Sequence, residues 1–387
     1  MPIVTTYPYQ QYQGVWTLSQ ASDAVAQGKW PAYPTPALYA WGQNNFGQLG
    51  LGNTSYKSSP NQVGTLKNWL MVANGYGNTI AVKTDGTLWS WGSNQFGQLG
   101  LGNLTYYSSP KQIGALNNWL AVSAGYNISF GIKADGTLWS WGKNDLGQLG
   151  QGNLTNLSSP KQIGTLTNWL NVSSGRYNVV AIKSNGSLWA WGSNNNGQLG
   201  NGNTTYYSSP IQIGSLTTWA NGFTDCMGTA VFATKTDGTL WAWGRNVAGQ
   251  LGLGNSNNYS SPKQVGSLTT WSKAFLGIYH SLFIKTDGTL WGAGSNSYGQ
   301  LGLGNQTNYS SPVQIGASTN WSSGGCSVYG SQAIQKNGTL WAWGRNQFGQ
   351  LGLGNTTYYS SPKQVGSSTN WFSVSGGGSQ TLAIAKF

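Results

Sequence analysis

The residues that could carry out acid–base, nucleophilic or metal chemistry are few in this sequence of 387 residues. There is one histidine, His280, there are two cysteines, Cys226 and Cys326, and there is no glutamate. The acidic side chains are seven aspartates, namely Asp23, Asp85, Asp135, Asp145, Asp225, Asp237 and Asp287. General acid–base catalysis and zinc binding both require several such groups close together.

Most of these aspartates have a structural explanation. Four of them precede a glycine in a short hairpin pattern, at Asp85, Asp135, Asp237 and Asp287. The remaining Asp23, Asp145 and Asp225 are scattered and do not provide the paired carboxylates of a glycosidase. No Gly-Lys-Ser/Thr sequence opens a phosphate-binding loop. We therefore expect a protein that is not an enzyme, with no catalytic residue, metal or cofactor, and with both cysteines as free, packed thiols.

The composition is typical of a rigid β scaffold. The chain has 58 glycines, 21 tryptophans and 20 tyrosines, whereas only 7% of its residues are charged. Disordered chains are poor in aromatic residues, so this class is excluded. No apolar run approaches the length of a membrane span, and no basic segment followed by an apolar stretch indicates a secretory signal.

An internal repeat must position any functional residue. The tetrapeptide Gly-Gln-Leu-Gly occurs seven times at intervals of 50 or 52 residues, beginning at Gly47, Gly97, Gly147, Gly197, Gly249, Gly299 and Gly349. It lies in the longer unit L-W-x-W-G-x-N-x-x-G-Q-L-G-x-G-N-x-x-x-x-S-S-P-x-Q-[VI]-G. Repeats of this length are typical of propellers and solenoids.

Each unit is predicted to contain four β-strands. Residues 79–83 and 87–91 alternate in polarity around Asp85-Gly86, which predicts a hairpin with a type I′ turn. Short strands near residues 62–63 and 69–73 complete the unit. Seven such units predict an all-β, seven-bladed propeller.

The two ends of the chain are predicted to share one blade. Residues 381–384 match the strand before each hairpin, and residues 38–42 match the strand after it. Pairing them would close the ring and leave no open edge strand. We therefore divide the chain into an N-terminal segment, 1–37, and a propeller, 38–387. Nineteen tryptophans recur in the units and are expected to pack between blades.

The strings W-G-x-N-x-x-G-Q-L-G-x-G-N and G-I-Y-H-S, the latter at residues 277–281, resemble the repeat of the regulator of chromosome condensation family. The resemblance covers residues 38–387 and implies a seven-bladed propeller with a split blade. Members of that family include an exchange factor for a small nuclear GTPase and a secreted bacterial inhibitor of β-lactamases. This chain is less similar to the exchange factor, because it lacks glutamate and a basic tail. His280 is expected to be a packed strand residue.

Residues 1–37 lie outside the repeat. Leu18, Ala21 and Val25 have helical spacing between Trp16 and Trp30, which predicts a short docking helix. Packing of this helix on its own propeller is the alternative. The string G-V-W-T-L-S-Q-x-x-x-A-x-x-x-G-x-W-P also resembles short segments in structural proteins of tailed bacteriophages. This resemblance implies a particle-docking segment.

Two sets of recurring residues are candidates for binding. Tyrosines between G-N and S-S-P could contact a protein or a sugar, or pack beneath the loop: Tyr56, Tyr106, Tyr107, Tyr206, Tyr207, Tyr259, Tyr309, Tyr358 and Tyr359. Basic residues also recur, so the net charge of +12 is expected to circle the ring, either to attract an anionic partner or to keep the chain solvated. These residues include Lys83, Lys133, Lys183, Lys235, Lys285 and Lys336, which precede the hairpins.

The repeats differ most from one another just before the hairpin strand. The divergent positions are Tyr76-Gly77, Arg176-Tyr177, Asp225-Cys226-Met227, Ile278-Tyr279 and Ser327-Val328-Tyr329. This divergence indicates either drift or an asymmetric binding site.

The leading hypothesis is a virion structural protein of a tailed phage, displayed on the capsid or tail as a decoration or adhesion module. Its partners would be other virion proteins, and host-surface polysaccharide or protein, with no specific nucleic acid. It would be assembled in the host cytoplasm. The alternative is a soluble propeller that binds and inhibits or regulates a protein partner.

Overall fold

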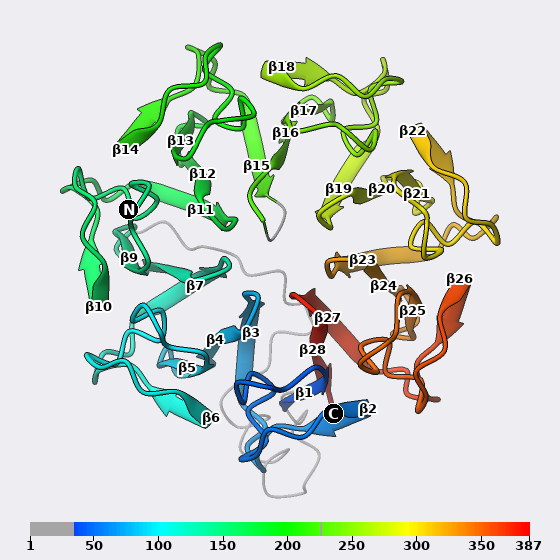
Figure 1. Cartoon of the computed structure of the whole chain (residues 1–387), viewed down its shortest axis with the longest axis horizontal. Helices are drawn as coiled ribbons and strands as arrows, with labels where there is room; N and C mark the ends of the chain where they lie inside the picture. The colour runs from blue at the N-terminus through cyan, green and yellow to red at the C-terminus, as the bar shows by residue number, and fades with distance from the viewer. Residues whose placement is uncertain (1–34, 225–226) are drawn as a thin grey trace, which may run out of the picture. The chain divides into compact units, whose positions relative to one another are not determined.

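The computed structural model describes residues 35–224 and 227–387. These residues form 28 strands in seven four-stranded antiparallel sheets. The sheets are arranged as blades around a central axis (Figure 1). This arrangement confirms the all-β, seven-bladed propeller.

Each blade repeats the same four strands, numbered here from the axis outward. The first strands are β3 (Trp69–Asn74), β7 (Trp119–Ala124), β11 (Trp169–Ser174), β15 (Trp219–Thr224), β19 (Trp271–Leu276), β23 (Trp321–Cys326) and β27 (Trp371–Gly376). The second strands are β4 (Asn78–Lys83), β8 (Ile128–Lys133), β12 (Asn178–Lys183), β16 (Ala230–Lys235), β20 (His280–Lys285), β24 (Gly330–Gln335) and β28 (Gln380–Lys386).

The outer two strands complete each sheet. The third strands are β5 (Leu88–Gly92), β9 (Leu138–Gly142), β13 (Leu188–Gly192), β17 (Leu240–Gly244), β21 (Leu290–Gly294), β25 (Leu340–Gly344) and β1 (Pro36–Gly42). The fourth strands are β6 (Tyr107–Gln112), β10 (Leu157–Gln162), β14 (Tyr207–Gln212), β18 (Tyr259–Gln264), β22 (Tyr309–Gln314), β26 (Tyr359–Gln364) and β2 (Lys57–Gln62). Blades 1 to 6 begin at β3, β7, β11, β15, β19 and β23, and blade 7 begins at β27.

Blade 7 joins the two ends of the repeat region. Its strand order is β2-β1-β28-β27, and β1 pairs with β28 in antiparallel register, with Leu38 opposite Ile384 and Trp41 opposite Thr381. The predicted shared blade is therefore confirmed.

The hairpin turns differ from the predicted type. In the described residues only glycines have positive φ, so Asp85 lacks the positive φ that a type I′ turn requires. The N–H of Gly86 instead donates to the carbonyl of Lys83 at 2.9 Å, and Gly86 has a φ of 78°. This is a type I turn followed by a left-handed glycine, the geometry of a three-residue hairpin loop. The type I′ prediction was wrong because it assumed a two-residue loop, Asp85-Gly86, whereas the loop also includes Thr84.

The Gly-Gln-Leu-Gly motif joins neighbouring blades. The carbonyl of Gln98 in blade 1 accepts hydrogen bonds from Trp141 Nε1 at 3.0 Å and from Ser129 Oγ at 2.8 Å, both in blade 2. Gly100 lies so close to the Trp141 indole that an added Cβ would be 2.7 Å from Nε1. The motif therefore supplies an acceptor for a buried donor and the space for an indole.

The recurring tryptophans occupy three environments. Those that begin the first strands are nearly buried, and the second tryptophan of W-x-W is fully buried, as at Trp141. The first tryptophan of W-x-W is only partly buried, as at Trp139. In blade 5 the second tryptophan of W-x-W is replaced by Ala293, which is also fully buried. Phe283 packs against Trp271 there, with ring centres 5.5 Å apart, and takes the place of that tryptophan's indole.

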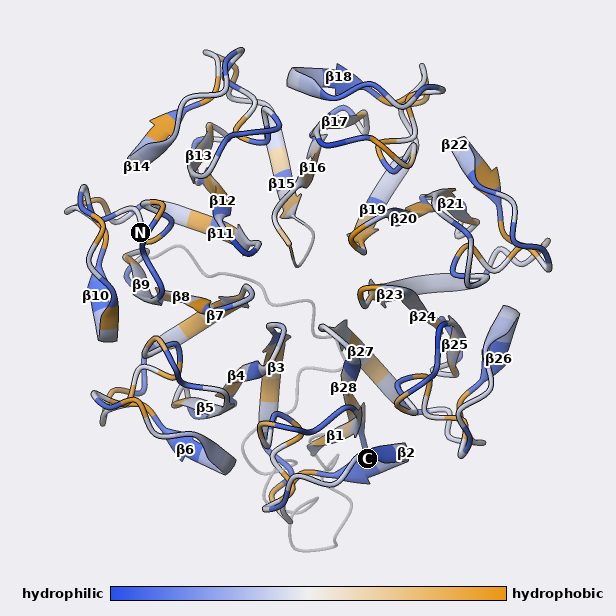
Figure 2. Cartoon of the chain, viewed as in Figure 1, coloured by the Kyte–Doolittle hydropathy of each residue, from blue (hydrophilic) through white to orange (hydrophobic). Residues whose placement is uncertain are grey.

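Hydropathy is distributed radially. The apolar cores lie between adjacent blades, whereas outer strands such as β2, β6 and β10 are mainly hydrophilic (Figure 2). Within the described ranges, no helix has the length and apolar character needed to cross a membrane.

Candidate functional site

Two faces of the propeller differ in their connections. The loop face carries the short connections between first and second strands, such as residues 75–77, and the long connections between third and fourth strands, such as residues 93–106. The turn face carries the hairpin turns, such as residues 84–87, and the connections between blades, such as residues 113–118. Successive units therefore bring equivalent loops together around the axis.

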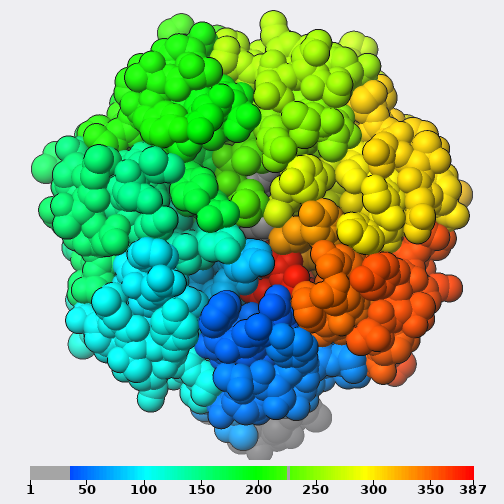
Figure 3. Space-filling view, viewed as in Figure 1, coloured from blue at the N-terminus to red at the C-terminus, as the bar shows by residue number. Residues whose placement is uncertain are grey.

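A cavity of about 500 Å³ lies among the loop-face connections. In the space-filling view the blades surround a central hollow (Figure 3). The charged and aromatic residues that line the loop-face cavity are Tyr76, Tyr126, Arg176, Arg245, Tyr279, Tyr329, Arg345 and Phe348. Several come from the positions at which the repeats diverge, so the ring gathers the divergent residues into one site.

Arg176 is held between two tyrosine rings. Its guanidinium carbon lies 4.2 Å from the ring centre of Tyr126 and 4.7 Å from that of Tyr177. Tyr126 in turn stacks on Tyr76 with ring centres 4.2 Å apart. Guanidinium groups stack well on aromatic faces, and this leaves their edges available for planar acceptors.

A second cluster lies in blades 4 to 6. The guanidinium carbon of Arg345 is 5.3 Å from the ring centres of both Tyr298 and Tyr329, and that of Arg245 is 5.2 Å from Tyr279. Burial, together with the neighbouring Tyr279 and Tyr298 hydroxyls, raises the pKa of Tyr329 above its ordinary value. The phenol is therefore neutral and can donate a hydrogen bond.

The three arginines of the cavity have no carboxylate partner among the described residues, where the one ion pair is Lys143 with Asp145. The Nε atoms of Arg176 and Arg345 are buried and make no hydrogen bond within residues 35–224 and 227–387. Among the described residues, the hydrogen-bonding contact of Arg176 Nη1 is with the Met227 sulfur at 4.0 Å, and Arg345 donates to the Gln347 side chain. Buried donors without partners favour an anionic or acceptor-rich ligand.

The sequence comparisons agree with this architecture. The regulator of chromosome condensation (RCC1) repeat matches the chain seven times, at residues 37–82, 85–132, 135–182, 185–221, 237–284, 287–333 and 337–384. The chain belongs to the RCC1 repeat family. None of the curated proteins matches it in sequence.

Solved RCC1-repeat propellers share its fold. Human WBSCR16 superposes with a TM-score of 0.80 and 22% identity, over 91% of this chain and 99% of that protein. Prp20p from Saccharomyces cerevisiae, whose structure was reported with its binding to Gsp1p and histones, has a TM-score of 0.82 and 20% identity, over 92% of both chains. Yeast Prp20 bound to Kap60 has a TM-score of 0.82 and 21% identity, over 92% of this chain and 90% of that one.

The predicted tyrosines of this RCC1-repeat protein divide into two sets. The exposed set lies on the loop face and consists of Tyr56, Tyr106, Tyr206 and Tyr358. The ring centre of Tyr56 lies 5.5 Å from that of Phe348, which lines the cavity, and the ring centre of Tyr358 lies 5.9 Å from that of Tyr298. Through these contacts, Tyr56 and Tyr358 join the aromatic residues near the cavity arginines.

The second set begins the fourth strands and is partly buried. Its members are Tyr107, Tyr207, Tyr259, Tyr309 and Tyr359. The hydroxyls of Tyr107, Tyr259 and Tyr359 accept hydrogen bonds from asparagines four residues earlier, and Tyr207, Tyr259 and Tyr359 pack on the apolar cores. The packing of this set between blades accounts for its recurrence. A binding role for either set stays a prediction.

Other predicted residues have clear positions. His280 is fully buried, with Nε2 2.9 Å from Ser331 Oγ of the next blade, as expected for a packed strand residue. Cys326 is a free, buried thiol, and burial raises its pKa. Cys226 and the docking residues Trp16, Leu18, Ala21, Val25 and Trp30 lie outside the described residues.

One set of the recurring basic residues packs on aromatic rings, whereas others, such as Lys111 and Lys161, are exposed. Five lysines at the ends of second strands, Lys83, Lys133, Lys183, Lys235 and Lys285, lie over tryptophan rings. In blade 6 the residue opposite the first tryptophan, Trp321, is Gln335, and Lys336 follows it in the chain. Lys336 is therefore not equivalent to these five lysines.

From the sequence, Arg176 was one of the divergent positions that indicate drift or an asymmetric binding site, and Arg245 and Arg345 were among the recurring basic residues that could attract an anionic partner. Arg245 and Arg345 follow the W-G motif, and Arg176 is at a divergent position. The usable signal was the change to arginine at loop positions that carry other residues in the remaining units.

Proposed function

We propose that this chain is a protein-binding propeller that inhibits or regulates a partner by receiving an acidic segment of that partner in the loop-face cavity. The observation that carries the proposal is the convergence of Arg176, Arg245 and Arg345 on one cavity without a carboxylate partner in the described part of the chain.

The chemistry of the cavity favours carboxylates. Arginine edges form paired hydrogen bonds with carboxylate oxygens, and stacking on tyrosine fixes the guanidinium planes before binding. Tyrosine and arginine are also the residue types enriched at the energetic centres of protein interfaces. The volume of about 500 Å³ suits a few side chains of a protruding loop rather than a folded domain.

The family supports protein binding as the general use of the fold. Yeast Prp20 binds Gsp1p, histones and Kap60. In this chain the divergent residues lie at one end of an otherwise repetitive scaffold. Functional residues on loops above a rigid framework are the usual arrangement in binding proteins.

A peptide selection tests the proposal. The full chain is immobilised, and random dodecapeptides displayed on ribosomes are selected against it at physiological salt. We expect enrichment of peptides with two or more Asp or Glu residues, and loss of that enrichment in the triple variant Arg176→Gln/Arg245→Gln/Arg345→Gln.

A control with the same charge change makes the result specific. The variant Lys111→Gln/Lys161→Gln/Lys363→Gln removes three exposed charges from fourth strands and should retain the enrichment. Enrichment of neutral or basic peptides, or equal loss in both variants, would contradict an acidic ligand in the cavity.

The virion hypothesis stays a prediction. It depends on residues 1–37, of which the structure describes only 35–37. Mass spectrometry of purified particles from the source tests it, since a stoichiometric copy number would establish a structural role on the particle. Absence from particles would leave the regulator hypothesis.

A further inference from the structure

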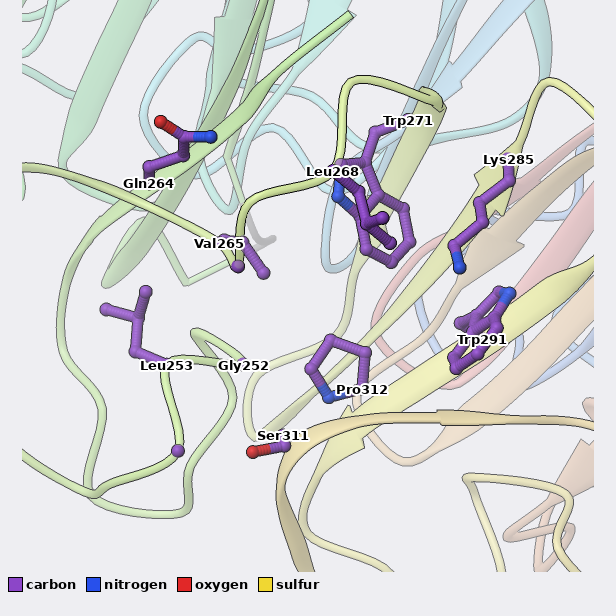
Figure 4. A pocket seen from close by; sticks show the side chains of 12 residues that line it. Gly252, Leu253, Gln264, Val265, Leu268, Trp271, Lys285, Trp291, Ser311 and Pro312 are labelled. Atoms are coloured by element: carbon purple, nitrogen blue, oxygen red, sulfur yellow. The ribbon is translucent and has the colours of Figure 1, made fainter.

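A groove between neighbouring blades lies outside the loop-face cavity. Between blades 1 and 2 it measures about 400 Å³, and Leu116, Trp119, Lys133, Trp139 and Pro160 contribute to its lining. Between blades 4 and 5 the equivalent groove measures about 340 Å³ (Figure 4). We call this feature the flank groove.

The lysine of the flank groove is almost fully buried in blades 1 to 3 and partly buried in blades 4 and 5. Lys133 is 5% exposed, and its Nζ lies 3.6 Å from the ring centre of Trp139 and 4.9 Å from that of Trp119. In the described ranges its Nζ makes no hydrogen bond, and the only ion pair there is between two other residues. In Figure 4 the equivalent Lys285 extends toward Trp291. Asp135, two residues on in the hairpin turn, attracts the Lys133 ammonium, but among the described residues no carboxylate lies within ion-pair distance of it. The ammonium can therefore still pair with a negatively charged ligand.

The lysine and the leucine of the groove occur together. Blades 1 to 5 each have both, as the pairs Leu66 and Lys83, Leu116 and Lys133, Leu166 and Lys183, Leu216 and Lys235, and Leu268 and Lys285. Blade 6 has Ser318 and Gln335, and blade 7 has Ser368 and Ala385.

Blades 6 and 7 nevertheless have the same four strands. The first tryptophan of each of these blades is buried, as in the other five. The Leu–Lys pair is therefore not required for a blade to fold, and its joint presence in five grooves needs another explanation.

The groove is poorly suited to an extended peptide. Peptides commonly add to a sheet through its edge, but each fourth strand contains a proline, such as Pro160, which cannot donate to an added strand. The partly exposed indole and the exposed leucine instead offer a flat apolar surface beside a cation. A sugar ring bearing a carboxylate presents these two complementary features, because its C–H face is apolar and its carboxylate is charged.

We propose that the flank grooves of blades 1 to 5 are equivalent binding sites for an acidic polysaccharide, each holding one uronate unit. The sugar ring would pack on the indole and the leucine, and its carboxylate would pair with the lysine ammonium. Five weak sites around one ring would act together on a repetitive polymer, since binding at one site raises the local concentration at the next. This proposal uses residues separate from those of the proposed function.

Affinity electrophoresis of the full chain in gels containing polygalacturonate tests the proposal. We expect retardation of the wild type at moderate salt, and at least a tenfold weaker apparent affinity for the variant with Lys83, Lys133, Lys183, Lys235 and Lys285 all replaced by Gln. Glutamine is the residue of blade 6 at this position, so the replacements are compatible with the blade fold. The charge-matched control replaces Lys57, Lys111, Lys161, Lys263 and Lys363 by Gln and should keep most of the affinity.

A gain-of-binding variant checks the assignment in the opposite direction. Introducing Ser318→Leu and Gln335→Lys together would give blade 6 a sixth groove and should increase the retardation. Equal retardation by poly-glutamate would show that charge alone is recognised, and equal retardation by neutral dextran would show that the lysines play no part. Either result, or an equal loss in both five-lysine variants, would overturn the proposal.

Discussion

The single histidine provides a quantitative test of the packing between blades 5 and 6. His280 is fully buried, its Nε2 contacts Ser331, and its Nδ1 has no hydrogen-bond partner in the part of the chain that the structure describes. Burial lowers the pKa of His280 to about 3, from an ordinary value near 6.5. The folded protein therefore keeps the imidazole neutral under conditions where the unfolded chain takes up a proton.

The sign and size of the effect follow from proton linkage. Above about pH 6.5 the imidazole is neutral in both states and does not affect the free energy of unfolding. As the pH falls from about 6.5 toward 3, only the unfolded chain gains the proton, so stability decreases by about 1.4 kcal/mol per pH unit. Between about pH 7.5 and about pH 5, His280 is expected to lower the free energy of unfolding by about 2 kcal/mol.

The variant His280→Asn isolates this contribution, because Asn78 and Asn178 occupy the equivalent position in blades 1 and 3. Urea unfolding followed by tryptophan fluorescence at the two pH values should show a loss about 2 kcal/mol larger for the wild type than for the variant. In NMR spectra the lone imidazole Cε1–H signal should not titrate above pH 5. A titration midpoint near 6.5, with the same pH dependence in both proteins, would refute the reasoning.

Three further predictions concern the framework. Gly100→Ala should lower the free energy of unfolding by about 1–3 kcal/mol more than Gly114→Ala. Both glycines have positive φ, but only at Gly100 would the added Cβ meet an indole, at 2.7 Å from Trp141 Nε1. Equal losses in urea unfolding would contradict this. Ala293→Trp and Phe283→Ala should each destabilise blade 5, whereas the double variant should recover most of the stability, as measured by a double-mutant cycle; additive losses would show that the phenyl ring does not replace the indole. Hydrogen bonds from the side chain and backbone of the threonine two residues on lower the pKa of Asp135, so the wild type should lose stability as the pH falls below about 3.8, and Asp135→Asn should lose less in melting curves at pH 5 and pH 2.5.

The fold was predictable because each unit encodes its own local structure. Asp-Gly or Asn-Gly marks every full hairpin, and seven nearly identical units leave few ways to bury their apolar faces. The closing blade followed from matching residues 38–42 and 381–384 to the internal strands. The turn type was not predictable from two residues, because the hydrogen bond that defines it involves Lys83.

The candidate site depends on contacts between distant units. Arg176, Arg245 and Arg345 belong to three different units and meet only because the ring brings the loop-face connections together. Their divergence from the repeat was visible in the sequence, but their position in one shared cavity was not. A binding role for these positions, as opposed to drift, stays a prediction. The burial of Lys133 was also hidden, because lysine periodicity alone is equally typical of a solvated surface.

The closing blade determines the order in which the chain can be completed. Within the propeller, β1 and β2 are synthesised before the other strands, whereas β27 and β28, which complete their sheet, are synthesised after all of them. Until then, the inner edge of β1 is an unpaired strand edge that can pair with another nascent chain. The same long-range pairing makes the final step of folding slow and locks the finished ring, so that loss of the last two strands would open both ends of the repeat array at once.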